Sequence, residues 1–137
     1  MTNRVERLID ANLNRLREGI RVIEDINRYI YNNKTLTPKL KSIRHAVAKG
    51  YDTKRLQHRD ILGDIQKKSI DTELARSSIE DIVIANFSRA TESARVLEES
   101  FKLGNIELSE HFKQIRYELY EVERLFFAST NSTSNSK

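Results

Sequence analysis

Two stretches of the sequence are related to each other: ANLNRLREGIRVIED at residues 11–25 and ANFSRATESARVLEE at residues 85–99. Aligned at a shift of 74, they share seven identical residues, where unrelated segments of this length share about one. A second match follows, because four residues align at a shift of 72 with four others: Leu40, Lys41, Ile43 and Arg44 with Phe112, Lys113, Ile115 and Arg116. Apolar residues recur with helical spacing in both copies, which predicts two related helical hairpins.

The first hairpin is expected to contain helices over residues 4–32 and 37–50. Gly19 is the only glycine or proline in the first of these segments. Thr37 followed by Pro38 is typical of an N-cap with proline at the first helical position. Neither helix can bury its apolar stripe alone, so the two are expected to fold back on each other.

The second hairpin is expected to contain helices over residues 79–103 and 109–127. Ser78 and Asp81 resemble a capping box at its start, and Gly104 closes its first helix. Two hairpins packed together make an all-α bundle related by a pseudo-twofold axis.

The remaining segments lack a clear helical period. Residues 51–72 contain the polar string RDILGD at 59–64, and a short connecting helix followed by a loop is expected there. Residues 129–137 read STNSTSNSK, too polar to offset the entropy of ordering, so a disordered tail is expected. Residues 1–128 are therefore predicted to form a single helical domain.

Composition narrows the classes of function. The 137 residues include no cysteine and three histidines, which excludes disulfides and cysteine-ligated metals, and the histidines are expected at the surface. The sequence shows no membrane-spanning run and no signal peptide, so a cytoplasmic protein is expected. A net charge of +4 favours a small anionic ligand, and because 20 acidic residues are interleaved with 24 basic ones, no nucleic-acid surface is expected.

Polar and small residues interrupt the apolar seam of both hairpins at matching positions. Asn12 and Asn86 are equivalent, and Gly19 is equivalent to Ser93. Such residues can fix helix register or let helices approach closely, or they can leave room for a bound molecule. Room for a ligand is the interpretation favoured here, which predicts a wet, cationic hole at the centre of the bundle.

Charged residues repeat beside these positions. Arg15 and Glu18 follow Asn12, and Arg89 and Glu92 follow Asn86. Their spacing also suits ordinary surface ion pairs. Two further arginines on otherwise apolar helix faces could bind a ligand or pair with Glu18 and Glu92 across each hairpin: Arg44 and Arg116. The aromatic residues near the second of these are expected in the core: Tyr117 and Tyr120.

This set of residues suits the binding of phosphate groups. The fork of donors on arginine matches phosphate oxygens, and carboxylates together with substrate phosphates are what Mg²⁺ prefers. The sequence lacks the glycine-rich loops of the standard nucleotide folds. The residues alone therefore predict a helical domain with a site for an anionic ligand.

Five segments give the sequence a more specific resemblance: DANLNRLREGIRVIEDINRY, SIRHAV, RDILGD, ANFSRATESARVLEE and IRYELYEVE. It resembles the small helical, monofunctional hydroxymethylpyrimidine phosphate kinase family of thiamine biosynthesis, a domain often fused in front of thiamine-phosphate synthase. The resemblance implies transfer of the γ-phosphoryl group of ATP, with Mg²⁺, to 4-amino-5-hydroxymethyl-2-methylpyrimidine phosphate. It also implies a functional link to thiamine-phosphate synthase, as a stand-alone enzyme or as part of a fusion.

Carried over to this chain, the family's motifs fall on the repeated residues and on RDILGD. We expect Arg59, Asp60 and Asp64 to be catalytic, with Asp60 and Asp64 as the ligands of Mg²⁺. Substrate and phosphate binding is expected of ten residues: Asn12, Arg15, Glu18, Gly19, Arg44, Gly63, Asn86, Arg89, Glu92 and Arg116. Ile61 departs from the family's usual threonine and removes a hydroxyl ligand.

A second class of function stays open at this point. Long amphipathic helices with a basic balance also suit a non-catalytic module that binds a phosphorylated ligand, RNA or a protein partner. Helices of this length in a small domain could also leave an apolar strip for self-association into a homo-oligomer.

Overall fold

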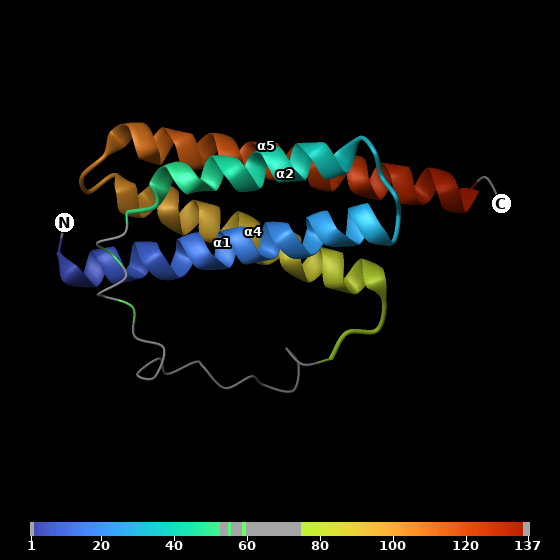
Figure 1. Cartoon of the computed structure of the whole chain (residues 1–137), viewed down its shortest axis with the longest axis horizontal. Coiled ribbons are helices and arrows are strands. Elements are labelled where there is room, and N and C mark those ends of the chain that lie inside the picture. The colour runs from blue at the N-terminus through green and yellow to red at the C-terminus, as the bar shows by residue number, and fades with distance from the viewer. Residues whose placement is uncertain (1, 53–54, 56–58, 60–74, 136–137) are drawn as a thin grey trace.

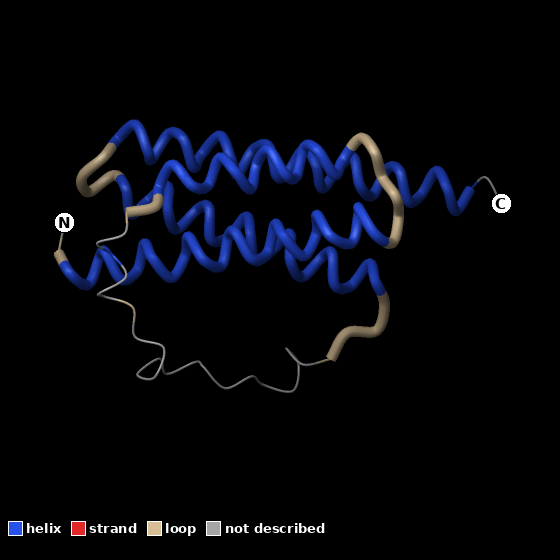
Figure 2. Tube along the Cα trace, in the orientation of Figure 1, coloured by secondary structure: helices blue, strands red, loops and turns tan. Residues whose placement is uncertain are grey.

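In a computed structural model of the chain, residues 2–52, 55, 59 and 75–135 are described, with side chains as far as residue 130. This part forms four α-helices and one 3-10 turn: α1 (Asn3–Tyr29), α2 (Leu36–Val47), η1 (Ala48–Gly50), α4 (Ile79–Phe101) and α5 (Ile106–Asn135). Figure 2 shows only helices and loops in these ranges. The predicted all-α bundle is confirmed.

The helices are arranged as two hairpins in two layers (Figure 1). α1 packs on α2 and α4, and α5 packs on α4 and α2. α1 and α4 run in opposite directions side by side, as do α2 and α5 in the second layer (Figure 1). The repeated sequence segments therefore lie at the middle of the α1–α4 interface.

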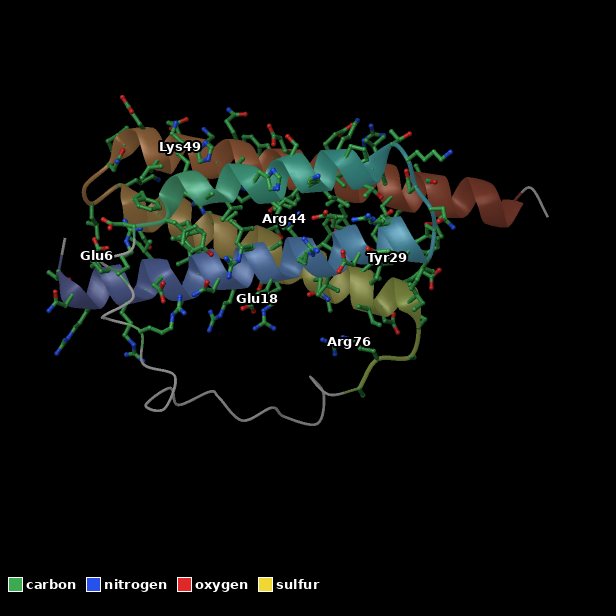
Figure 3. All side chains as sticks on the ribbon, viewed as in Figure 1. Glu6, Glu18, Tyr29, Arg44, Lys49 and Arg76 are labelled. Carbon is green, nitrogen blue, oxygen red and sulfur yellow. The ribbon has the colours of Figure 1, made fainter. Side chains whose placement is uncertain are left out.

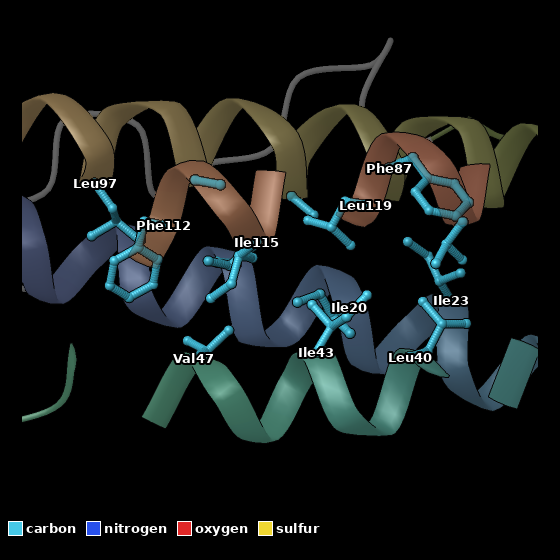
Figure 4. Close-up of a cluster of buried hydrophobic side chains, with 14 of the residues drawn as sticks. Ile20, Ile23, Leu40, Ile43, Val47, Phe87, Leu97, Phe112, Ile115 and Leu119 are labelled. Atoms are coloured by element: carbon cyan, nitrogen blue, oxygen red, sulfur yellow. The ribbon is translucent and has the colours of Figure 1, made fainter. Parts of the chain in front are cut away.

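An apolar core fills the space between the layers. Figure 4 shows side chains of all four helices meeting there, including Ile20, Ile43, Phe87 and Leu119. The rings of Phe101 and Phe112 stack at 5.5 Å between centroids. Ile30, at the C-cap of α1, is exposed.

Local signals place the helix ends, although not always where the sequence suggests. The Ser78 hydroxyl accepts from the amide of Asp81 (3.1 Å), which confirms the predicted cap of α4. For α2 the predicted cap at Thr37 is wrong, because the Asn33 carboxamide accepts from the amides of Thr35 and Leu36 (3.1 and 2.9 Å). The helix therefore begins at Leu36, two residues earlier than an N-cap at Thr37 would allow.

α5 is longer than predicted at both ends. The Asn105 carboxamide accepts from the amide of Leu108 (3.1 Å), so the helix begins at Ile106 instead of near Ser109. At the other end it continues through Asn135, where a disordered tail after residue 128 is expected from composition. The Thr130 hydroxyl donates back to the carbonyl of Phe126 (3.0 Å), so here a polar side chain satisfies itself within the helix.

The two tyrosines of α5 that were expected in the core lie at the surface. Tyr117 and Tyr120 are exposed, 48% and 45%, so their expected place in the core is wrong. Arg116 lies over both rings at 4.9 and 5.9 Å, which holds them at the surface of α5. No described helix is long and apolar enough to cross a membrane.

Candidate functional site

α1 and α4 are in close contact at Gly19. A Cβ atom there would lie 3.2 Å from the backbone oxygen of Asn86 and 3.5 Å from the Cβ atom of Ala90. The glycine therefore permits close approach of the two helices, and the expectation that it leaves room for a ligand is wrong. The pseudo-twofold arrangement puts Ser93 at the equivalent place on α4, where its hydroxyl donates to the carbonyl of Arg89 (2.8 Å).

The two repeated asparagines flank this contact. The amide of Asn12 donates to the carbonyl of Leu8 (3.0 Å), and the amide of Asn86 donates to the carbonyl of Ile82 (2.8 Å). Each side chain thus bonds back to its own helix one turn earlier. Among the described residues, no donor reaches either carboxamide oxygen.

The charged residues that follow each asparagine lie outside the core. Arg15, Glu18, Arg89 and Glu92 are all exposed. Figure 3 shows Glu18 on the side of α1 that faces away from α2 and α5. The predicted cationic hole at the centre of the bundle is therefore wrong. A position three residues after a seam residue is rotated by roughly 60° from it, and this rotation carries the guanidinium groups to the rim.

We name six residues the paired face; its four charged side chains are exposed, Asn86 is half-buried and Asn12 is 3% exposed: Asn12, Arg15, Glu18, Asn86, Arg89 and Glu92. Its four charged residues make no ion pair within the described part of the chain. Two cations and two carboxylates are therefore presented to solvent on either side of the Gly19 contact. This arrangement can bind anionic ligands from outside the bundle.

Arg44 and Arg116 lie inside the hairpins and make buried ion pairs. The Arg44 guanidinium donates to both oxygens of Glu24 (2.6 and 3.2 Å), and Figure 3 shows Arg44 between α1 and α2. The Arg116 guanidinium donates to Glu98 (2.9 and 3.2 Å). The expected partners, Glu18 and Glu92, are wrong, because the true carboxylates lie six residues further along each helix, where the helix faces its hairpin partner.

These pairs perturb the arginines in the same direction. Hydrogen bonding to Glu24 raises the pKa of Arg44, and hydrogen bonding to Glu98 raises the pKa of Arg116. Both cations are thus held in the charged form inside the fold.

Arg59, the first residue of RDILGD, contacts α1 at Asp10. Its Nε and Nη2 atoms donate to the two carboxylate oxygens at 2.9 and 3.0 Å. The hydrogen bond to Asp10 raises the pKa of Arg59, and the charge of Glu18 adds to that effect. Arg59 therefore lies within electrostatic reach of the paired face. The other predicted residues of this segment, Asp60, Gly63 and Asp64, lie outside the described residues, as does Ile61.

The sequence pattern did not identify the residues of α1 that contact Tyr51 and Arg59 in the segment after η1, which we call the connector. The Tyr51 hydroxyl donates to the carboxamide oxygen of Asn14 (3.2 Å), and the Arg17 guanidinium lies 5.3 Å from the centre of the Tyr51 ring. Burial raises the pKa of Tyr51. The available signal is that positions 10, 14 and 17 differ chemically from their repeat equivalents, Ile84, Ser88 and Thr91.

No group of three or more potential metal ligands occurs among the residues that the structure describes. His45 is exposed, and the ring of His111 is hydrogen-bonded to the carbonyl of Ala46 at 2.7 Å, so neither lies in a metal cluster. His58 lies outside the described part. The residues expected to bind Mg²⁺, Asp60 and Asp64, lie outside this part as well.

A model of the ThiD2 family matches residues 7–125, which include the paired face, all of α2 and α4, and most of α1 and α5. The chain belongs to the ThiD2 family. It is 39% identical over 120 residues to the thiamine-phosphate synthase of Nostoc punctiforme, a match that covers 87% of this chain and 34% of that protein.

Two further relatives of this ThiD2 chain are also thiamine-phosphate synthases. The thiamine-phosphate synthase of Prochlorococcus marinus strain SARG is 36% identical over 135 residues, covering 93% of this chain and 37% of the relative. That of a Synechocystis species is 34% identical over 120 residues, covering 87% and 35%. The chain therefore spans about a third of the length of these curated relatives. No solved structure matches it significantly.

Proposed function

We propose that this chain is an ATP-dependent phosphotransferase of thiamine biosynthesis that converts 4-amino-5-hydroxymethyl-2-methylpyrimidine phosphate to its diphosphate. Membership of the ThiD2 family and relatives that are named thiamine-phosphate synthase support the pathway. The diphosphate product is the pyrimidine substrate that such a synthase consumes. A functional link between the two activities follows from this relation.

The observation that carries the proposal is the duplicated, exposed pair of arginines on the paired face. Arg15 and Arg89 come from different hairpins and are both free of ion pairs among the described residues. The reaction brings together two phosphorylated molecules, which need cations on both sides of the transferred group. Arg59, held by Asp10 close enough for Glu18 to affect its pKa, supplies a third cation.

The chemistry requires little covalent participation from the protein. An oxygen of the substrate's phosphate attacks the γ-phosphorus of ATP, the bond from that phosphorus to the bridging oxygen breaks, and ADP leaves with the electron pair. Positioning and charge neutralisation by Arg15, Arg59 and Arg89 lower the barrier. Mg²⁺, when bound with the nucleotide, would neutralise phosphate charge, and Asp60 and Asp64 are the proposed carboxylate ligands.

The asparagines suit recognition of the pyrimidine ring. The amide nitrogens of Asn12 and Asn86 are committed to their own helices. The carboxamide oxygens are then the atoms left to accept a hydrogen bond from the exocyclic amine of the substrate. Glu18 and Glu92 supply further acceptors at equivalent places.

The buried arginines have a more limited place in the proposal. Arg44 and Arg116 are engaged by Glu24 and Glu98, so they support the hairpins directly and bind phosphate only if those pairs rearrange. Phosphate binding is therefore assigned first to the exposed arginines.

Phosphorus NMR tests the proposed reaction directly. The protein is incubated with Mg-ATP and hydroxymethylpyrimidine monophosphate, and the diphosphate signal is followed. We expect product with the wild-type chain, and a loss of about 10- to 100-fold in kcat/KM for Arg15→Ala and for Arg89→Ala, since each removes one charge-assisted contact. Arg124→Ala is the matched control, because Arg124 is an exposed arginine of α5 that pairs only with Glu121 among the described residues.

The outcomes separate the classes of function. Absence of product with measurable binding of the monophosphate would leave a ligand-binding module. Absence of both product and binding would contradict the proposal altogether. Equal effects of all three arginine variants would show that the paired face has no special role.

A further inference from the structure

The two halves of the bundle differ on one flank of their first helices. On α1 this flank carries Asp10, Asn14 and Arg17, whereas the equivalent residues on α4 are Ile84, Ser88 and Thr91. The α1 residues are engaged by Arg59 and Tyr51. Ile84, the counterpart of Asp10, is 46% exposed. The charged and amide side chains on this flank of α1 therefore have no equivalents on α4.

The carboxylate of Asp10 is buried, and it forms an ion pair with an arginine that is partly exposed. The Asp10 side chain is 5% exposed, and that of Arg59 is 36% exposed. Of the five N–H donors of a guanidinium, the pair uses two, which leaves three on the outward edge of Arg59. The fork fixes the plane of the guanidinium while that edge stays available for a phosphate oxygen.

Anchoring of the connector alone does not require this pair. Arg55 already ties the same segment to α1, since it donates to the carboxylate of Glu6 and to the carbonyl of Gly50. Arg55 is buried and lies 5.5 Å from the centre of the Phe101 ring. The Arg55 side chain is 9% exposed, whereas that of Arg59 is 36% exposed, so of the two arginines Arg59 is the one that faces solvent.

We infer that Asp10 is a positioning residue for phosphoryl transfer: it orients Arg59 so that the free edge of the guanidinium binds a phosphate of the reacting molecules. The inference rests on the proposed function. Asp10 itself touches neither substrate, because both of its oxygens face the guanidinium.

A double-mutant cycle tests whether Asp10 acts through Arg59. Steady-state kinetics is measured for Asp10→Asn, Arg59→Ala and the double variant. We expect each single change to lower kcat/KM by about 10- to 100-fold, and the double variant to be no worse than Arg59→Ala, because the carboxylate has no further group to orient. Additive losses in the double variant would overturn the inference while leaving the proposed function intact.

Two control variants separate positioning from stability. Glu6→Gln breaks the neighbouring pair and is expected to lower the melting temperature while preserving kcat/KM. Glu121→Gln breaks a remote exposed pair and is expected to change neither quantity. A loss of activity in Glu6→Gln that matches Asp10→Asn at equal melting temperatures would overturn the inference, because general anchoring would then explain both.

The binding of ligand distinguishes failure of the inference from failure of the proposed function. Isothermal titration with Mg-ATP and with hydroxymethylpyrimidine monophosphate is performed on the same variants. If the wild-type chain binds but does not turn over, the kinase proposal fails and the cycle in Kd still decides whether Asp10 acts through Arg59. If it binds neither probe, both fail, since Arg59 then holds no phosphate of these ligands.

Discussion

The α1–α2 and α4–α5 hairpins share a repeated sequence pattern, but their buried glutamates form different ion pairs. In the first, Glu24 is held by Arg44 alone among the described residues, while Arg21 turns to Asp25 at 3.4 Å. In the second, Glu98 is shared between Arg116 and Arg95 at 2.9 and 2.7 Å. Arg21 and Arg95 are repeat equivalents. The equivalent arginine therefore pairs with an exposed carboxylate in the first half and with a buried carboxylate in the second.

The largest expected effect comes from removing the buried arginine of each half. Arg44→Met strands a nearly buried carboxylate, which costs about 3 kcal/mol in free energy of unfolding. Arg116→Met leaves Glu98 with Arg95, so the cost should be about 1 to 2 kcal/mol. Urea denaturation of the two variants measures the difference. Equal losses would show that the half-exposed Arg95 does not compensate.

The combined change Arg44→Met with Glu24→Leu sharpens the same comparison. Replacing a buried ion pair by apolar residues of similar size is often neutral, so most of the lost stability should return. Activity of this stable variant then tests the predicted role of Arg44 in substrate binding. Retained activity would assign Arg44 to the scaffold alone.

Much of the fold could be predicted from the repeat, because helical periodicity and matched hairpins depend on local sequence. The placement of the site could not. Asn12 and Asn86 lie where the pattern puts them, but a seam position does not reveal whether a neighbouring arginine points inward or to the rim. Gly19 was ambiguous in the same way. A glycine in a helix is compatible with an open space or with close packing of a second helix, and the sequence alone does not distinguish the two.

Capping and pairing were also underdetermined, for a different reason. Thr37 and Pro38 formed a plausible start signal, but Asn33 lies four residues earlier and accepts from the amides of Thr35 and Leu36, which precede that signal. Glu18 was the partner suggested for Arg44 by the sequence, but the rotation of α1 against α2 brings Glu24 to that arginine instead. The Asp10–Arg59 contact joins residues 49 apart in sequence, and no periodic pattern encodes it.

A second comparison concerns Gly19 of α1 and Ser93 of α4, and its expected effect is intermediate. Gly19→Leu would force α4 away from the Asn86 backbone, at a cost of about 2 kcal/mol in stability. Ser93→Ala removes only a bond to the carbonyl of Arg89 within the same helix, so its effect should stay within about 0.5 kcal/mol. Thermal melting followed by circular dichroism measures both. A leucine tolerated at position 19 would revive the expectation of open space there.

The smallest expected effect lies where the second helices of the two halves diverge. α2 ends at Val47 and the chain leaves toward Arg59, whereas α5 continues through Glu123, which is partly buried and has no ion-pair or hydrogen-bond partner among the described residues. Burial raises the pKa of Glu123.

A raised folded-state pKa means that the folded chain holds this proton more tightly than the unfolded chain, so stability falls as pH rises from the unfolded pKa through the folded one. Glu123→Gln should therefore raise the melting temperature at pH 7 by about 1 to 3 °C, a gain that disappears below pH ~4, where the wild-type carboxyl is protonated in both states. Melting curves of both proteins between pH 3 and 8 test this. A gain that is the same at every pH would assign the effect to helix propensity instead of charge, and would show that the extension of α5 carries no electrostatic cost.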